Sequence, residues 1–196
     1  MAVFADYLDL RVAVSEHVGN RNISDVMKRL VQQAESSLNR QLRTRKQITT
    51  DTLTFTDGAA TLPTDFLEMI NVYDGNGQPM RAGTLSGNKA YGANYWRYAI
   101  NGSQVLIEAL SGDRDIEYFA ALPTITSSVS GSNWLLQQYP DVYLYAAGLE
   151  AAKFLRDADL VNATQPLLAQ SLNSVMADDE KARWSNATVR VVGITP

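Results

Sequence analysis

The sequence predicts an α+β protein with a four-helix core (two N-terminal and two C-terminal helices), an inserted antiparallel β-sandwich-like module and an extended C-terminal β-type tail. Three observations predict this class. A helical hydrophobic period fills both ends of the chain, short alternating runs between turn residues fill the middle, and the last residues favour a strand but follow no turn. The expected parts are residues 1–49, 50–125, 126–185 and 186–196. With 196 residues, of which 45% are hydrophobic, the chain can bury a substantial core.

Two amphipathic helices are expected within residues 1–49. In the first, apolar residues recur every three or four positions as far as Gly19-Asn20, a pair that suits a helix C-terminus. Ser24 is expected to cap the second helix, which reaches about Arg43. The apolar stripe of this second helix comprises Met27, Leu30, Val31, Ala34, Leu38 and Leu42.

The β-module is predicted from its turns. Asp-Gly or Asn-Gly pairs at 57–58, 74–77 and 101–102 separate short runs rich in Thr, Tyr, Val and Ile, which is typical of hairpins. In the strand at 95–100, alternation puts Trp96, Tyr98 and Ile100 on one face, and Val105 and Ile107 share a face of the next strand. A sheet with one buried side predicts a small β-sandwich.

The C-terminal helices follow a polar stretch, residues 126–132, which is expected to be a hinge. Pro140 begins a helix that runs to about Arg156 and has a wide apolar face; Glu150 in it is expected to be a buried partner for another helix. Asp159 is expected to cap the last helix, and Pro166 either kinks or restarts it. The acids at 178–180 are expected to form a solvated face.

Composition excludes several kinds of chemistry. With no cysteine, the chain has no disulfide, thiolate metal site or iron–sulfur cluster. The single histidine, His17, lies in a helical segment without nucleophile-elbow glycines, and no phosphate-binding glycine loop is present. We therefore expect no enzyme, no catalytic residues, no cofactor and no metal. No secretory signal and no run of about 20 apolar residues is visible.

Charge is distributed unevenly. The net charge of −4 argues against DNA binding by a broad basic surface, yet residues 1–46 hold eight basic and five acidic side chains. The end of the second helix is crowded with Arg40, Arg43, Arg45 and Lys46. These cations either complement the helix dipole or contact an acidic partner or phosphate.

The C-terminal tail has high β-propensity and no turn before it. An unpaired strand exposes a row of backbone donors and acceptors. It is therefore expected to pair either with the β-module of its own chain or with a neighbouring chain. The residues concerned are Val189, Arg190, Val191, Val192 and Ile194. A self-sufficient enzyme rarely needs such a tail, whereas an assembly protein often does.

Four segments of the chain form a pattern by their order and spacing. One lies in the second helix, one opens the β-module and two lie in the third helix and just before it. They are Ala34-Glu35 with Leu38–Arg43, Leu62–Glu68, Trp134–Leu136 with Tyr139–Ala147, and Glu150–Ala152 with Leu155–Asp157. Together they resemble the head-to-tail adaptor (connector) proteins of tailed bacteriophages. Pro166 departs from the unbroken last helix expected of that family.

This resemblance implies a structural virion protein of the neck at a capsid vertex, made in the host cytoplasm. It implies a ring of copies, usually a dodecamer, that docks on the portal protein, extends the DNA channel and gives tail or nozzle proteins a platform. Genomic DNA would pass through the lumen without sequence-specific binding, and no membrane is involved. The tail is then expected to carry portal or subunit attachment, and the four clustered cations to make ion pairs with a neighbouring subunit or the portal.

Two other functions remain open at this point. Tyr91, Tyr95, Trp96 and Tyr98 suggest a stacking platform, and so a carbohydrate- or receptor-binding module on a helical stalk. The 21 acidic residues also allow a pair of carboxylates, and so a peptidoglycan-cleaving enzyme.

Overall fold

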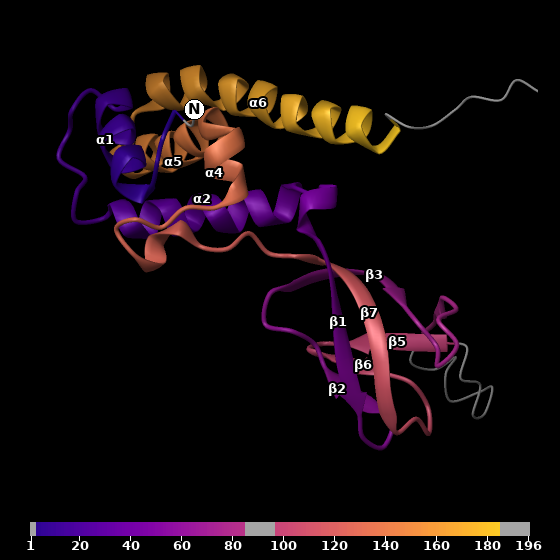
Figure 1. Ribbon diagram of the computed structural model, residues 1–196. Coiled ribbons are helices and arrows are strands. Elements are labelled where there is room, and N and C mark those ends of the chain that lie inside the picture. The colour runs from indigo at the N-terminus through magenta and orange to yellow at the C-terminus, as the bar shows by residue number, and fades with distance from the viewer. Residues whose placement is uncertain (1–2, 85–96, 185–196) are drawn as a thin grey trace, which may run out of the picture. The chain divides into compact units, whose positions relative to one another are not determined.

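The computed structural model describes residues 3–84 and 97–184 and divides into two compact units (Figure 1). The helical unit combines the chain up to Arg45 with the chain from Pro123 onward. The β-unit, residues 46–122, contains every strand that the structure describes. The α+β class predicted from the hydrophobic periods is confirmed.

Helix α5 (Pro140–Leu155) is the centre of the helical unit. It contacts each of the other helices described there: α1 (Tyr7–His17), α2 (Met27–Gln41), α4 (Trp134–Gln138) and α6 (Ala158–Trp184). Small and apolar residues on most sides of α5 permit this, because Ala146, Ala147, Ala151 and Ala152 are all buried. The short helix α4 is a fifth element, which the predicted four-helix core did not include.

Gly148 lets α1 pack closely against α5. A Cβ at this position would lie 2.7 Å from the His17 ring, so any larger residue would force the ring to move from its place over Gly148. The Nε2 atom of His17 is 3.0 Å from the Oγ1 atom of Thr164 in α6, and Thr164 is fully buried. His17 therefore joins α1, α5 and α6, and burial lowers the pKa of its imidazole.

A buried carboxylate, Glu35 of α2, ties separate segments of the helical unit together. It accepts hydrogen bonds from the backbone N–H of Ile125 (2.8 Å), the hydroxyl of Thr124 (2.7 Å) and the hydroxyl of Tyr143 (3.3 Å). Burial, with the nearby charge of Glu35 as the next cause, raises the pKa of the Tyr143 phenol. Glu35 is only 5% exposed, so its charge depends on these donors.

Asn133 extends this network to α4. Its side-chain NH₂ donates to the Tyr143 hydroxyl (2.7 Å) and to the Pro123 carbonyl (2.8 Å). Its side-chain oxygen accepts from the first backbone N–H groups of α4, those of Leu135 and Leu136. The stretch expected to be a hinge, 126–132, is therefore anchored. Its first residues lie in the 3₁₀ turn η2 (Ile125–Ser127), in which Thr126 is buried, and the Gly131 carbonyl accepts a hydrogen bond from the Tyr7 N–H of α1 (2.9 Å).

Three local expectations for the helices are wrong. Helix α2 begins after Val26 with no side-chain cap, so Ser24 does not cap it. The cap of α6 is Asp157 rather than Asp159, because the Asp157 carboxylate accepts from the N–H of Leu160 (3.1 Å). Glu150 is not a buried inter-helix partner, since it pairs with Lys153 of its own helix at 2.7 Å. Helix α6 continues through Pro166.

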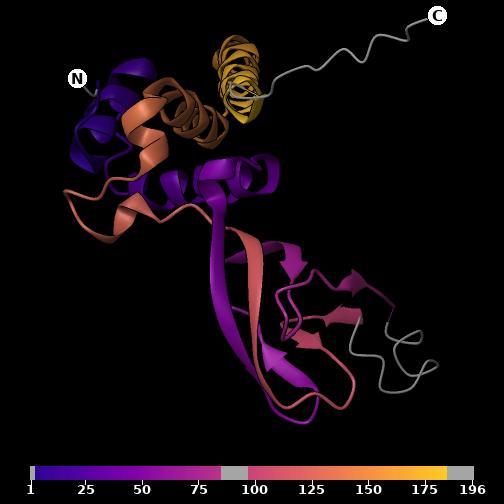
Figure 2. The ribbon, with the colours of Figure 1, turned by 45° about the vertical axis from the view of Figure 1, so that its right-hand side comes forward.

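The β-unit consists of two sheets that share one core (Figure 2). In the first, β7 (Gly112–Ala120) lies between β1 (Ile48–Phe55) and β3 (Phe66–Val72), and both pairings are antiparallel. The second has the order β2 (Ala59–Thr61), β6 (Gln104–Leu106), β5 (Arg97–Asn101) and β4 (Arg81–Ala82). Strands β4 and β5 pair in parallel, so this sheet is mixed rather than wholly antiparallel.

The predicted turns have two different outcomes. Asn101-Gly102 joins β5 to β6 in an antiparallel pair, as predicted. At Asp57-Gly58 both residues have positive φ (50° and 83°), and the flanking Thr56 and Ala59 form a bridge. Beyond that bridge the strands separate, because β1 pairs with β7 and β2 pairs with β6. This turn therefore passes the chain from one sheet to the other.

The core of the β-unit corrects the predicted face of β5. Tyr98, Val105 and Ile107 are buried as expected. Ile100, however, is 40% exposed, while Ala99 is 2% exposed. The strict alternation fails near the turn into β6, and Trp96 lies outside the described residues.

Replacing Glu35 by Leu is predicted to destabilise the helical unit by about 3–5 kcal/mol, because three donors lose their acceptor and two of them, the Ile125 N–H and the Tyr143 hydroxyl, belong to buried residues. Glu35→Gln keeps one acceptor oxygen and should cost roughly half as much. Urea unfolding followed by far-UV circular dichroism measures the free energy. Glu150→Gln is the matched control on a partly exposed acid, with an expected change below about 0.5 kcal/mol. Equal costs for Glu35→Leu and Glu150→Gln would contradict the network.

Stability is predicted to fall as the pH drops below about 6.5, the ordinary pKa of histidine. The folded pKa of His17 is lower than the unfolded one, so the unfolded chain binds the proton first. The contribution is complete above the unfolded pKa and is lost as the pH falls toward the folded pKa. Unfolding free energies between pH 5 and pH 8 should show this slope, and His17→Gln should remove it. An unchanged slope in the variant would assign the effect to other groups.

Candidate interaction surfaces

Residues 3–84 and 97–184 do not contain a group of three or more histidines and carboxylates placed to hold a metal ion. No helix in this part of the chain is long and apolar enough to cross a membrane. The hollow on the β-unit, lined by Asp51, Tyr73 and Asp115 among others, has its acids engaged locally, because Asp115 accepts from the Thr52 hydroxyl at 2.7 Å. The candidate surfaces from the sequence are those around the predicted basic cluster and the chain end.

Arg45, which follows α2 in the chain, contacts the last turns of α6. Its backbone N–H donates to Asp179 (3.0 Å), and its guanidinium lies 3.6 Å from the same carboxylate. The guanidinium also donates to the Ala182 carbonyl (3.3 Å). Carbonyl groups in the last turn of a helix lack a partner within the helix and carry partial negative charge, so Arg45 complements the end of α6.

The other three predicted cations occupy different settings. Arg43 donates to the carbonyls of Asn39 (2.8 Å) and Leu42 (2.6 Å), and so complements the end of α2. Arg40 is exposed and donates to the Ser36 hydroxyl (3.1 Å). Lys46 is exposed and is the first residue of the β-unit. Within the chain, Arg43 and Arg45 therefore make the contacts expected of cations that complement a helix dipole.

The acidic run of α6 is not a uniformly solvated face, contrary to expectation. The side chain of Asp179 is 9% exposed and also accepts from Arg183 (2.9 Å). The Tyr139 hydroxyl donates to Asp178, and the pKa of this phenol is raised first by burial and then by Asp178. The last turns of α6 are thus held by contacts to the α2 end and to the α4–α5 junction.

The predicted tail, from Val189 to Ile194, lies outside the described residues. It follows Trp184, which is 67% exposed at the end of α6. Of the proposed stacking platform, Tyr98 is buried in the core of the β-unit and offers no free ring face. Tyr91, Tyr95 and Trp96 lie outside the described residues.

Sequence reasoning missed Glu35, Thr164 and Asp179. A signal for Glu35 was present, because it stands four residues after Val31 and three before Leu38, on the edge of the apolar stripe of α2. An acid at that position is expected to meet the core. Asp179 gave no such signal, because its partner is 134 residues away in the chain.

Replacing Arg45 by Ala is predicted to loosen the end of α6. Global stability should change by less than about 1 kcal/mol, because the ion pair is half exposed. Amide hydrogen exchange should accelerate in residues 178–184, where the Arg45 contacts are lost. Lys181→Ala is the matched control, since Lys181 is largely exposed and its ion pair with Asp178 is long, at 3.8 Å. Protection that is equal in both variants would show that Arg45 does not hold the helix end.

The comparisons with known proteins bear on the chain as a whole. It matches none of the curated proteins with which it was compared. The sequence profile of the SU10 adaptor protein family matches residues 5–192, which include both units and the tail region. A match of this extent confirms the resemblance to head-to-tail adaptors, so the chain belongs to the SU10 adaptor protein family and has the structural role of a phage adaptor.

Proposed function

We propose that this protein is a neck component of the virion that forms a ring, docks on the portal, extends the DNA channel and gives tail proteins a platform. The family match over residues 5–192 carries this proposal. A ring requires that two different surfaces of each copy meet, and a dodecamer is the stoichiometry we propose. The proposal gives the chain no catalytic step and no cofactor.

We assign portal or subunit attachment to the tail residues Val189, Arg190, Val191, Val192 and Ile194. Their composition favours a strand, and strand addition supplies backbone hydrogen bonds with a partner sheet. The described contacts support this assignment in one respect. Arg45 and Asp179 hold the end of α6, so the tail starts from an anchored position on the helical unit.

Arg40 is the member of the basic cluster best suited to an ion pair with a neighbouring subunit or the portal. It is exposed, and among the described residues its guanidinium meets only the Ser36 hydroxyl. The same proposal covers Arg43, Arg45 and Lys46, and two of these, Arg43 and Arg45, also donate to carbonyls at helix ends within the chain. The net charge of −4 suits a channel through which DNA slides, since phosphate-neutralising contacts are what hold DNA.

Truncation after Trp184 is predicted to leave the fold intact and to abolish binding to portal rings. The thermal unfolding curve should stay the same, because the described core contains no tail residue. Co-sedimentation with purified portal rings from the same virus measures binding. A chain that lacks only Thr195 and Pro196 is the control and should bind like the full chain.

Two results would contradict this proposal. If the truncated chain binds portal rings as tightly as the full chain, attachment lies in the described body rather than in the tail. If the full chain fails to bind portal rings but binds glycans or cleaves cell wall, the adaptor assignment itself is wrong.

A further inference from the structure

The two sheets of the β-unit end in four edge strands, β1, β2, β3 and β4. An edge strand presents unpaired backbone N–H and C=O groups, so proteins usually keep edges short, bulged or covered. Strands β2 and β4 have only three and two residues. Strand β3 has two register shifts, and its Val72 carbonyl accepts from the Met80 N–H at 2.7 Å. Strand β1 has none of these protections.

Strand β1 is eight residues long and pairs with β7 without a register shift. The Thr52 N–H donates to the Asp51 carboxylate at 2.8 Å, so this N–H points away from β7. Because backbone groups alternate in direction along a strand, those of Ile48, Thr50 and Thr54 point the same way. Among the described residues, no strand pairs with this outer side of β1. We call the outward backbone groups of residues 48, 50, 52 and 54 the β1 edge.

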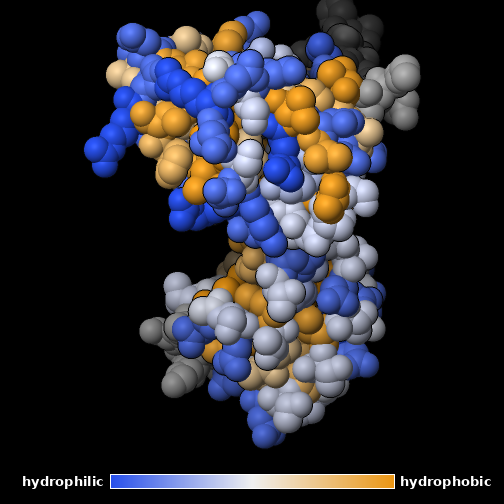
Figure 3. All heavy atoms as spheres, turned by 90° about the vertical axis from the view of Figure 1, so that its left-hand side faces the viewer, coloured by the Kyte–Doolittle hydropathy of each residue, from blue (hydrophilic) through white to orange (hydrophobic). Residues whose placement is uncertain are grey.

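The side chains along β1 also favour an added strand. Thr50, Thr52 and Thr54 are exposed, and the last two donate to acids of β7 at 2.7 Å, which fixes their rotamers. Figure 3 views the β-unit from the side on which β1 lies in Figure 1, and much of its surface there is of intermediate hydropathy. β-Branched residues are good cross-strand neighbours. The β1 edge therefore offers regular backbone donors and acceptors rather than an apolar patch, which is what strand addition uses.

The chain contains a segment that matches this edge. Thr188–Ile194 is seven residues long, close to the eight of β1, and five of its residues are β-branched. Arg190 is the only charged side chain in residues 187–196, and Asp51 is the only one in β1. Pairing with Arg190 opposite Asp51 keeps both charges paired and sets one register along the edge.

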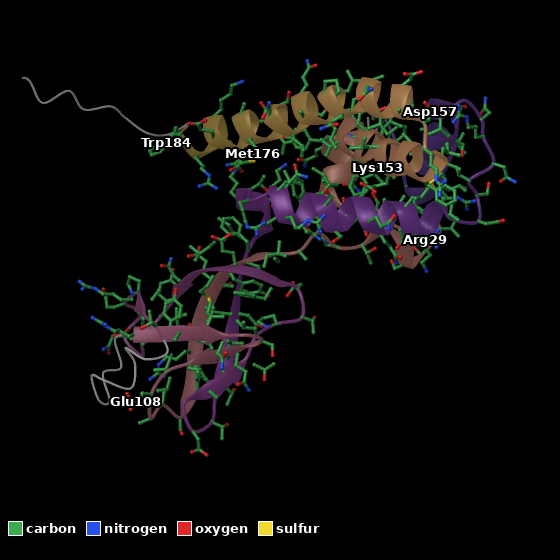
Figure 4. The ribbon with its side chains drawn as sticks, turned by 180° about the vertical axis from the view of Figure 1, so that it is seen from behind. Arg29, Glu108, Lys153, Asp157, Met176 and Trp184 are labelled. Atoms are coloured by element: carbon green, nitrogen blue, oxygen red, sulfur yellow. The ribbon has the colours of Figure 1, made fainter. Side chains whose placement is uncertain are left out.

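The start of the tail limits how it can pair within its own copy. Arg45 bonds to Asp179 and to the Ala182 carbonyl near the end of α6, and β1 begins three residues after Arg45. Figure 4 shows Trp184 at the end of α6 opposite to Asp157, where the tail begins. A tail that leaves from beside the residues preceding β1 can follow its own β1 only in the same direction, as a parallel strand.

The sheet that contains β1 favours the opposite direction. Both of its pairings are antiparallel, and one of its faces, which carries Thr52, Asp113 and Asp115, is exposed to solvent. Parallel strands are slightly less stable per residue and belong to sheets covered on both faces. An antiparallel tail on the β1 edge must therefore come from another copy.

We propose that the tail of one copy adds as an antiparallel strand to the β1 edge of a second copy, with Arg190 opposite Asp51. The inference rests on the proposed function, which assigns the tail to the portal or a subunit; it selects the subunit and names the strand that receives the tail. Main-chain hydrogen bonds supply the affinity, and alternate side chains of the tail supply the register.

Proline in the tail tests the main-chain hydrogen bonds. Val191→Pro and Val192→Pro each remove one N–H, and because neighbouring N–H groups point to opposite sides of a strand, one of the two faces β1. At least one variant should weaken self-association tenfold or more by sedimentation equilibrium. Val191→Thr and Val192→Thr keep the N–H and the β-branching, so these matched controls should associate like the full chain. No tail residue belongs to the described core, so thermal unfolding should stay the same.

Proline in β1 tests the receiving side. Thr50→Pro removes an outward N–H that does not pair with β7, so the β-unit should still fold. This variant should also weaken self-association at least tenfold, while Thr50→Val, which keeps the N–H, should leave it unchanged. Thermal unfolding of both variants checks the fold. If Thr50→Pro does not fold, the tail variants decide the question.

Cross-linking tests the copy and the direction, because the chain has no cysteine of its own. The proposed register puts Val191 opposite Thr50, so a mixture of Val191→Cys and Thr50→Cys should form a covalent dimer under mild oxidation. Val191→Cys with Thr54→Cys is the matched control, four residues along the same face, and should cross-link much less. An internal disulfide in the double variant Thr54→Cys/Val191→Cys, without dimers, would show parallel pairing within one copy and overturn the inference.

Binding to portal rings from the same virus is measured separately for each variant. Weaker self-association of the proline variants, with the threonine and valine controls unchanged, supports the inference. Unchanged self-association in every folded proline variant overturns it, and so does a full chain that stays monomeric both alone and on portal rings. If the full chain binds portal rings in these cases, the adaptor proposal still stands. A full chain that does not bind portal rings contradicts the proposed function instead.

Discussion

Burying the carboxylate of Glu35 imposes a constraint that organises the helical unit. An ion taken out of water costs several kcal/mol unless donors replace its hydration. Here the donors come from Thr124, Ile125 and Tyr143, and Asn133 holds the tyrosine hydroxyl in turn. Segments from both halves of the sequence must therefore meet around one side chain. A buried carboxylate is stable only when its hydrogen-bond donors are in place. The network therefore favours the packing arrangement that brings these donors to Glu35 over arrangements that leave one of them away from it.

The same network fixes the point where the chain re-enters the helical unit after the inserted β-unit. The chain re-enters the helical unit at Pro123, whose carbonyl is held by Asn133, and the next residue donates to Glu35. At the other crossing, Arg45 is held by Asp179. Both points where the chain passes between the units are thus bonded within the helical unit. An insertion of 77 residues is in this way compatible with a helical core assembled from distant parts of the sequence.

Regular periodicity made much of the fold predictable from sequence. The stripe of α2 and the Asn101-Gly102 hairpin depend on neighbours within a few residues, which a sequence displays directly. Glu150 and Glu35 show the limit. Both are acids among apolar helix residues, and only the packing of the whole unit decides which one is buried. The role of Arg45 was equally hidden, since it complements the end of a helix that begins more than a hundred residues later.

Helix α6 is held at both ends, by Arg21 on Asp157 and by Arg45 on Asp179, while Pro166 lies between. Proline supplies no backbone N–H, so the Asn162 carbonyl lacks its usual donor within the helix. Asp157 lies before this missing hydrogen bond and Asp179 lies after it. The two parts of α6 on either side of Pro166 are therefore each tied to the N-terminal segment of the helical unit by a contact of their own.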